Sequence, residues 1–129
     1  MVEISKEVKI IIYIDMIAAL IYGTMYLILP DILFAGEAYY NPHLTRLWGG
    51  VIFVLLIGAI IALKRGELET LKPVWEIAIL YWIMTDILNL AAFFYMPFSP
   101  LEVIRQWINT IVVAALLVIN LFFYSRAAK

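Results

Sequence analysis

The chain has 129 residues, of which 66% are hydrophobic and 15% charged, with a formal net charge of −1 and a mean hydropathy of +1.01. A soluble domain of this size could not hide so much apolar surface, because a small globule buries only about two-thirds of what its chain exposes. The sequence therefore predicts a membrane protein, and its near-neutral charge excludes the nucleic-acid-binding class.

Four apolar segments are long enough to cross a bilayer, which takes about 20 helical residues. They cover residues 10–29, 44–63, 74–96 and 103–124. Because backbone polar groups in lipid must be satisfied internally, helices are the expected form. We predict an all-α fold over residues 1–129: a single transmembrane domain, built as an integral membrane four-helix bundle.

The first segment carries Asp15 about 9 Å from its N-terminal end, too deep for this short side chain to reach the surface. The aspartate is therefore a candidate for a ligand or proton site, and a polar contact between helices is the structural alternative.

Small residues indicate how the first two helices meet. Ala19 and Gly23 are spaced four apart in the first segment, and Gly50 and Gly58 lie at the depths of Gly23 and Asp15 in the second. Small residues let helix backbones approach closely. We expect close packing of this hairpin, with a homodimer face as the alternative for glycines left exposed to lipid.

The connection 30–43 is too rich in apolar and aromatic residues to be a bare turn. We interpret it as an outer interfacial segment that lies on the lipid head groups, with Tyr39 and Tyr40 as anchors. A lid over an outward-facing cavity is the alternative.

Two helix starts are marked in the sequence. Asn41-Pro42 places an N-cap residue before a proline at the first helical position. Ser99-Pro100-Leu101-Glu102 has the pattern of a capping box with the same proline placement. These signals begin the second and fourth long helices.

Polar residues gather in the predicted outer half of the last two helices. Asp86 lies near the centre of its segment, where a carboxylate costs at least about 2.5–3.5 kcal/mol and must be protonated, paired or hydrated. Asn89 lies on the same face, and Asn109 lies at the same depth, about 12 Å, on the last helix. Arg105 is one turn away from Asn109. We predict a ligand or proton site here; hydrogen bonding that only joins the helices is the alternative.

Cationic residues predict the orientation in the membrane. Only Arg46 and Arg105, out of nine, belong to the side of the 30–43 connection. The others share the side of the termini and the middle connection: Lys6, Lys9, Lys64, Arg65, Lys72, Arg126 and Lys129. We predict a multi-pass protein of the cell membrane with cytoplasmic N- and C-termini.

The two halves of the chain echo each other. Asn41-Pro42 is followed by Arg46-Leu47-Trp48, and Ser99-Pro100 is followed by Arg105-Gln106-Trp107. Two repeated helical hairpins, related by an axis along the membrane normal, would explain this pattern. The ordinary placement of Trp and Arg near helix ends explains it equally well.

A family resemblance rests on the first half. Tyr22-Gly23 through Pro30, then Arg46-Leu47-Trp48-Gly49-Gly50 and Gly58, resemble the DoxX-like group of small four-helix prokaryotic membrane proteins. In that group a glycine and a proline close the first helix, and an arginine followed by glycines opens the second. The resemblance covers residues 10–65 and implies a four-helix fold.

Small multidrug transporters are also similar, in size, in their four helices and in an acidic residue of the first helix. Asp15 would take that part here. The long connection 30–43 and the second acidic helix, with Asp86, depart from that pattern.

Residue chemistry limits the possible activities. The chain has no cysteine and one histidine, His43, so thiolate sites are excluded and zinc, haem or copper sites lack ligands within one chain. No nucleophile–base pair can be assembled. We predict no catalytic residue, no metal site and no cofactor.

Three classes of function remain. We favour a non-catalytic protein that binds lipid or a hydrophobic small molecule, or acts as an accessory subunit. The alternative is a small proton-coupled transporter of a hydrophobic or cationic molecule, which would use Asp86 or Asp15. A lipid-modifying enzyme is disfavoured. Membrane lipids are the expected partners, and a homodimer is a further candidate.

Overall fold

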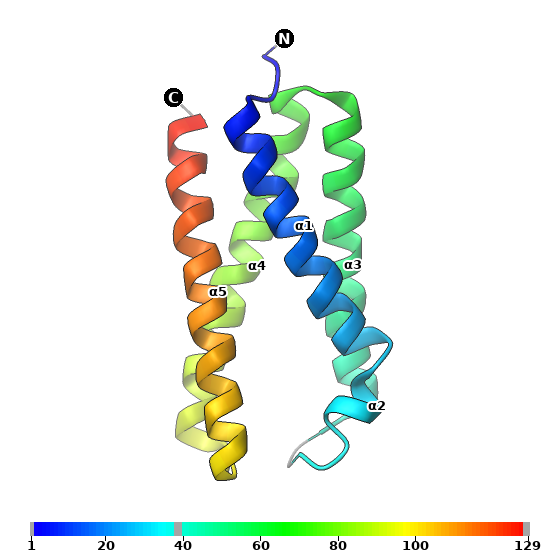
Figure 1. The fold of residues 1–129 in the computed structure, drawn as a ribbon, viewed down its shortest axis with the longest axis vertical. Helices are drawn as coiled ribbons and strands as arrows, with labels where there is room; N and C mark the ends of the chain where they lie inside the picture. Colours follow the sequence, from blue (N-terminus) through cyan, green and yellow to red (C-terminus); the bar gives the residue numbers. More distant parts are fainter. Residues whose placement is uncertain (1, 38–39, 128–129) are drawn as a thin grey trace. The chain divides into compact units, whose positions relative to one another are not determined.

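The computed structural model describes residues 2–37 and 40–127 and contains five helices there (Figure 1). They are α1 (Lys6–Leu27), α2 (Pro30–Leu33), α3 (Pro42–Arg65), α4 (Leu68–Tyr95) and α5 (Pro100–Ala127). Within the described ranges, the only strand-like feature is an isolated antiparallel bridge between Glu3 and Glu67. The predicted all-α class is confirmed.

All helices but the short α2 are long and apolar enough to cross a membrane. Each exposes large aliphatic side chains: Ile17 of α1 is 60% exposed, Val54 of α3 67%, Leu80 of α4 64% and Val118 of α5 66%. Such surfaces are costly in water and ordinary in lipid, so the protein is a multi-pass membrane protein.

The long helices extend beyond the apolar segments of the sequence. α1 begins at Lys6 because the Ser5 hydroxyl accepts a hydrogen bond from the Val8 N–H (3.3 Å). α3 continues to Arg65 and is ended by Gly66, whose φ of 75° is the left-handed conformation of a helix C-cap. α4 begins only two residues later, so the middle connection is very short.

Both marked helix starts are confirmed. The Asn41 side chain accepts from the Leu44 N–H (3.1 Å), and Pro42 is the first residue of α3. At α5, the Glu102 N–H donates to Ser99 Oγ and the Ser99 N–H donates to Glu102 Oε2, each at 3.3 Å. These reciprocal bonds are the two halves of a capping box.

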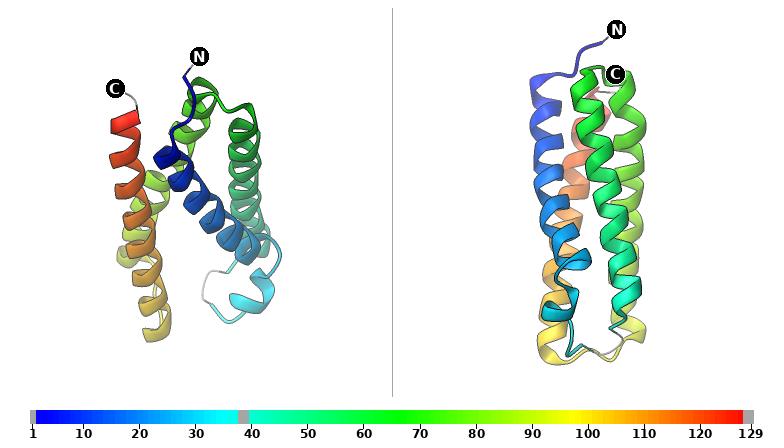
Figure 2. Two further views of the ribbon diagram at one scale, coloured as in Figure 1. Left: turned by 45° about the horizontal axis from the view of Figure 1, so that its top comes forward. Right: turned by 90° about the vertical axis from the view of Figure 1, so that its right-hand side faces the viewer.

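The chain divides into two compact units, Met1–Trp75 and Glu76–Lys129, with the boundary inside α4. In the first unit, α1 packs along α3, and α2 contacts both (Figures 1 and 2). Two glycines allow the close approach. A Cβ on Gly49 would stand 2.6 Å from the Leu27 nitrogen, and one on Gly23 would stand 3.0 Å from the Phe53 ring.

The N-terminal segment pairs with the turn between α3 and α4. The Ile4 N–H donates to the Gly66 carbonyl (3.2 Å), and the Leu68 N–H donates to the Val2 carbonyl (2.9 Å). The second bond satisfies one of the amide groups that a helix start leaves without an intrahelical partner. The Ile4 side chain is buried, as is Leu71 in the first turn of α4.

In the second unit, the remainder of α4 and α5 form a hairpin around residues 96–99. Near this turn, Gln106 of α5 hydrogen-bonds Asn89 of α4. At the other end of the hairpin, the Tyr124 hydroxyl donates to Glu76. The two contacts fix the register of the two helices.

Candidate functional site

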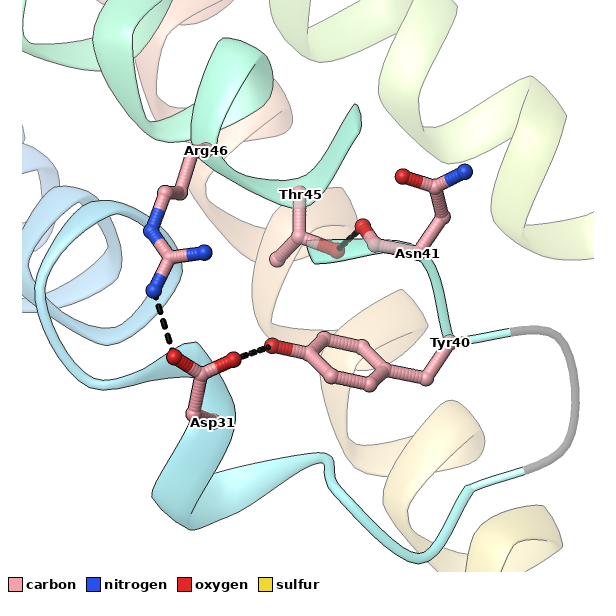
Figure 3. A network of polar contacts seen from close by, with 5 residues as sticks. All are labelled: Asp31, Tyr40, Asn41, Thr45 and Arg46. Atoms are coloured by element: carbon pink, nitrogen blue, oxygen red, sulfur yellow. Dashed lines mark hydrogen bonds and ion pairs between the residues drawn. The ribbon is translucent and has the colours of Figure 1, made fainter. Parts of the chain in front are cut away.

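A polar network joins α2 to the start of α3 (Figure 3). One oxygen of the Asp31 carboxylate accepts a hydrogen bond from the Tyr40 hydroxyl (2.6 Å). The other oxygen forms an ion pair with Arg46, whose Nη2 donates to it at 2.5 Å. We call these three residues the Asp31 network. It closes the connection between α1 and α3 on itself, because its members come from α2, from the residue before the N-cap and from α3.

Local structure positions each member of the network. Pro30 occupies the first position of α2 and sets Asp31 in its first turn. The Asn41 cap begins α3, and the Thr45 hydroxyl donates to the Asn41 carbonyl (2.8 Å), which holds the chain that carries Tyr40 (Figure 3). Arg46 follows directly after Thr45 and reaches back to α2.

The network keeps the Asp31 carboxylate charged. The hydrogen bonds from Tyr40 and from Arg46 lower its pKa below the ordinary 3.8, because both favour the anion. Desolvation and the hydrogen bond to Asp31 raise the Tyr40 pKa above the ordinary 10.0. At neutral pH the network therefore holds a carboxylate, a guanidinium and a neutral phenol.

An aromatic column leads from the network along α1. Its rings belong to Tyr22, Tyr26, Phe34 and Tyr40, with successive centroids 6.1, 5.5 and 6.4 Å apart. The first three rings are stacked nearly parallel, with interplanar angles of 17° at both steps. All four residues are half-buried, so part of the column remains open to its surroundings. A row of four aromatic rings thus ends at a pair of opposite charges.

A second set of polar side chains lies on α4 and α5, in the second unit. The Gln106 side-chain amide donates to the Asn89 backbone carbonyl (2.9 Å) and to Asn89 Oδ1 (3.3 Å). One turn from Asn89, the Oδ1 atom of Asp86 is buried and has no hydrogen-bond partner among the described residues. Beside the hairpin turn, Phe93 packs against Trp107, with ring centroids 4.6 Å apart, and against Phe98.

The other residues predicted for a ligand or proton site lie in different surroundings. The described contact of Asn89 is with Gln106, and Asn109 lies half-buried one turn further along α5. Arg105 is exposed on α5, and Asp15 is half-buried on α1.

The small residues predicted to pack the first two long helices also differ in their contacts. Ala19 and Gly23 are buried on α1. A Cβ on Gly58 would stand 3.3 Å from Val74 of α4, whereas one on Gly50 would meet nothing within 4 Å. The closest approach to α1 is made by Gly49, which neighbours Gly50.

Sequence reasoning did not identify the Asp31 network or Gln106 as site residues. From the sequence, Tyr40 is predicted as an interfacial anchor and Arg46 serves as an orientation signal, and neither is assigned to a site with Asp31. An acidic residue just after a span and an arginine just inside the next one are a usable signal for such a pair, because both lie at the same membrane face. Tyr39 was also predicted as an anchor and lies outside the described residues.

The described residues contain no group of three or more His, Asp or Glu side chains placed to hold a metal ion. Comparison of the chain with models of protein families, with curated proteins and with solved structures found no match.

Proposed function

We propose that this multi-pass protein is non-catalytic and binds a membrane lipid, or a hydrophobic molecule of similar shape, along the aromatic column. The observation that carries the proposal is the column itself: four half-buried rings in sequence, ending at the Asp31 network. An amphipathic ligand needs an apolar surface and a polar terminus next to it, and these residues provide both.

The column contributes more than general hydrophobicity. A flexible side chain would have to be immobilised by a ligand, whereas stacked rings are already ordered by one another, so less entropy is lost on binding. The rings also belong to three segments, namely α1, the C-cap of α2 and the residue before the α3 cap. Ligand binding would therefore stabilise the connection between α1 and α3.

Native mass spectrometry of the protein purified in mild detergent tests this function. We expect the wild type to retain lipid and to melt at a higher temperature when lipid is added back. Tyr26→Ala should lose most of the retained lipid, and Tyr26→Phe should keep it because the ring remains. Tyr13→Ala removes an exposed ring of α1 outside the column and serves as the matched control. Equal retention by Tyr26→Ala and Tyr13→Ala would refute the proposal.

A second candidate function is supported by Asp86. Its buried Oδ1 has no hydrogen-bond partner among the described residues, and a carboxyl oxygen in that state can take a proton or a cationic ligand. This favours a small proton-coupled transporter of a hydrophobic or cationic molecule. In proteoliposomes, a pH gradient should drive uptake of a lipophilic cation by the wild type and by Glu69→Gln, which removes an exposed charge. Asp86→Asn should abolish the uptake. Wild-type vesicles without uptake would remove this candidate.

A further inference from the structure

The charged pair of the Asp31 network is accessible and has unused binding capacity. The side chain of Asp31 is 61% exposed and that of Arg46 39%. A carboxylate offers about four lone-pair positions and a guanidinium five N–H donors. The described contacts occupy one lone pair on each carboxylate oxygen and one guanidinium nitrogen. Each side chain can therefore accept a further polar partner without breaking the pair.

The pair also presents opposite charges side by side with no net charge. A single anion would gain from Arg46 but would lie against the Asp31 carboxylate, and a single cation would meet the reverse arrangement. A group that carries both charges on a short bridge satisfies both residues together. The aromatic column that starts at Tyr40 suits a ligand whose remaining part is a hydrocarbon chain.

We propose that the Asp31–Arg46 pair binds the zwitterionic head group of a phospholipid with a primary ammonium, as in phosphatidylethanolamine, while an acyl chain lies along the aromatic column. The phosphate accepts hydrogen bonds from Arg46, and the ammonium donates to Asp31. This proposal rests on the proposed lipid-binding function and specifies its ligand. A quaternary ammonium has no N–H to donate, so phosphatidylcholine binds less well, and phosphatidylglycerol lacks the cation altogether.

Competition among lipids on the detergent-solubilised protein tests the head group. Equimolar dioleoyl phosphatidylethanolamine, phosphatidylcholine and phosphatidylglycerol are added, and bound species are counted by native mass spectrometry. We expect the wild type to prefer phosphatidylethanolamine. Asp31→Asn keeps an oxygen acceptor for Tyr40 but removes the negative charge. This variant should shift the ratio of bound phosphatidylethanolamine to bound phosphatidylglycerol about tenfold towards phosphatidylglycerol. A change of that size corresponds to the free energy of one charge-assisted hydrogen bond. Glu69→Gln, with the same charge change elsewhere in the first unit, should keep the wild-type ratio.

A second variant separates charge recognition from a damaged fold. Asp31→Arg combined with Arg46→Asp retains an ion pair of reversed direction, and it should restore the preference for phosphatidylethanolamine that Asp31→Asn loses. If the ratio is the same in the wild type, Asp31→Asn and Glu69→Gln while Tyr26→Ala still loses lipid, the head-group proposal fails and the lipid-binding function stands. If the wild type retains no lipid, both fail.

Discussion

Gly49 of α3 lies against Leu27 of α1 so closely that a Cβ on the glycine would stand 2.6 Å from the Leu27 backbone nitrogen. The obstacle is main chain, which cannot rotate away as a flexible side chain would. The absence of a side chain at this position therefore sets the distance between α1 and α3, next to the rings of the aromatic column.

The two adjacent glycines of α3 should respond in opposite ways to the same substitution. Gly49→Ala should destabilise the protein by about 1–3 kcal/mol, because the new methyl group overlaps backbone that must shift. Gly50→Ala should be neutral or stabilise by about 0.5–1 kcal/mol, because its Cβ meets nothing and alanine is the better helix former. Thermal unfolding in detergent measures both, and equal effects would contradict the packing described for Gly49.

The Asp31 network should hold at neutral pH and weaken at both extremes. The Asp31 pKa is lowered in the folded state, so its stabilisation is complete above the ordinary 3.8 and is lost as pH falls through the lowered value. The Tyr40 pKa is raised, so its contribution is present below the ordinary 10.0 and is lost as pH rises through the raised value. The segment around α2 should be ordered between these limits.

A nitroxide label on Gly36→Cys measures the loss of order around α2 when the Asp31 network weakens. The position is exposed, a Cβ there meets nothing within 4 Å, and the chain has no native cysteine. Label mobility should stay constant between about pH 5 and 9 and rise outside that range. Asp31→Asn should remove the acidic transition and leave the alkaline one. A label equally mobile at every pH would contradict the network.

Gln106 should matter more to the second unit than Asn109, although both are amides on one face of α5. Gln106→Leu removes two hydrogen bonds to Asn89, and we expect a cost of about 0.6–1.7 kcal/mol, between the average and the maximum measured for such bonds in a membrane protein. Asn109→Leu, with the same change of side chain one turn away, is the control and should cost less. Denaturant unfolding in micelles gives both values; a greater loss in Asn109→Leu would argue against the described register.

The orientation remains a prediction from the seven-to-two distribution of cationic residues. A membrane-impermeant maleimide should label Gly36→Cys in intact cells, whereas Glu69→Cys should react only after the membrane is opened. Both positions are exposed, so differences in reactivity report sidedness. Labelling of both cysteines from outside would overturn the predicted topology.

Hydropathy predicted the four spans, and short cap patterns predicted two helix starts, because both signals are local. The ends of the helices were less accessible. The length of an apolar segment indicates the thickness of lipid that it crosses. The helix itself continues to a capping residue, such as Ser5 at the start of α1 or Gly66 at the end of α3, which lies in charged sequence beyond the lipid.

The same cause explains the partner of Asn89. Counted from the predicted segment ends, Asn109 matches its depth. In the structure α4 ends at Tyr95 and α5 begins at Pro100, so Asn89 lies six residues before one end and Gln106 six residues after the other. Counting depth from the apolar segment, which starts at Val103, instead of from the capped helix start at Pro100 thus selects a different amide. The Asp31–Arg46 pair is harder still, since no periodicity relates residues across an irregular connection.

The pairing of Val2 and Ile4 with Gly66 and Leu68 has a consequence for biosynthesis. The strand-like segment leaves the ribosome well before its backbone partners, because Gly66 and Leu68 are made only after α1 and α3. The Ile4 N–H and the Val2 carbonyl must therefore remain bonded to water until Gly66 and Leu68 have been synthesised. Protection of the Ile4 amide from hydrogen exchange would therefore mark the step of membrane insertion at which the first unit closes.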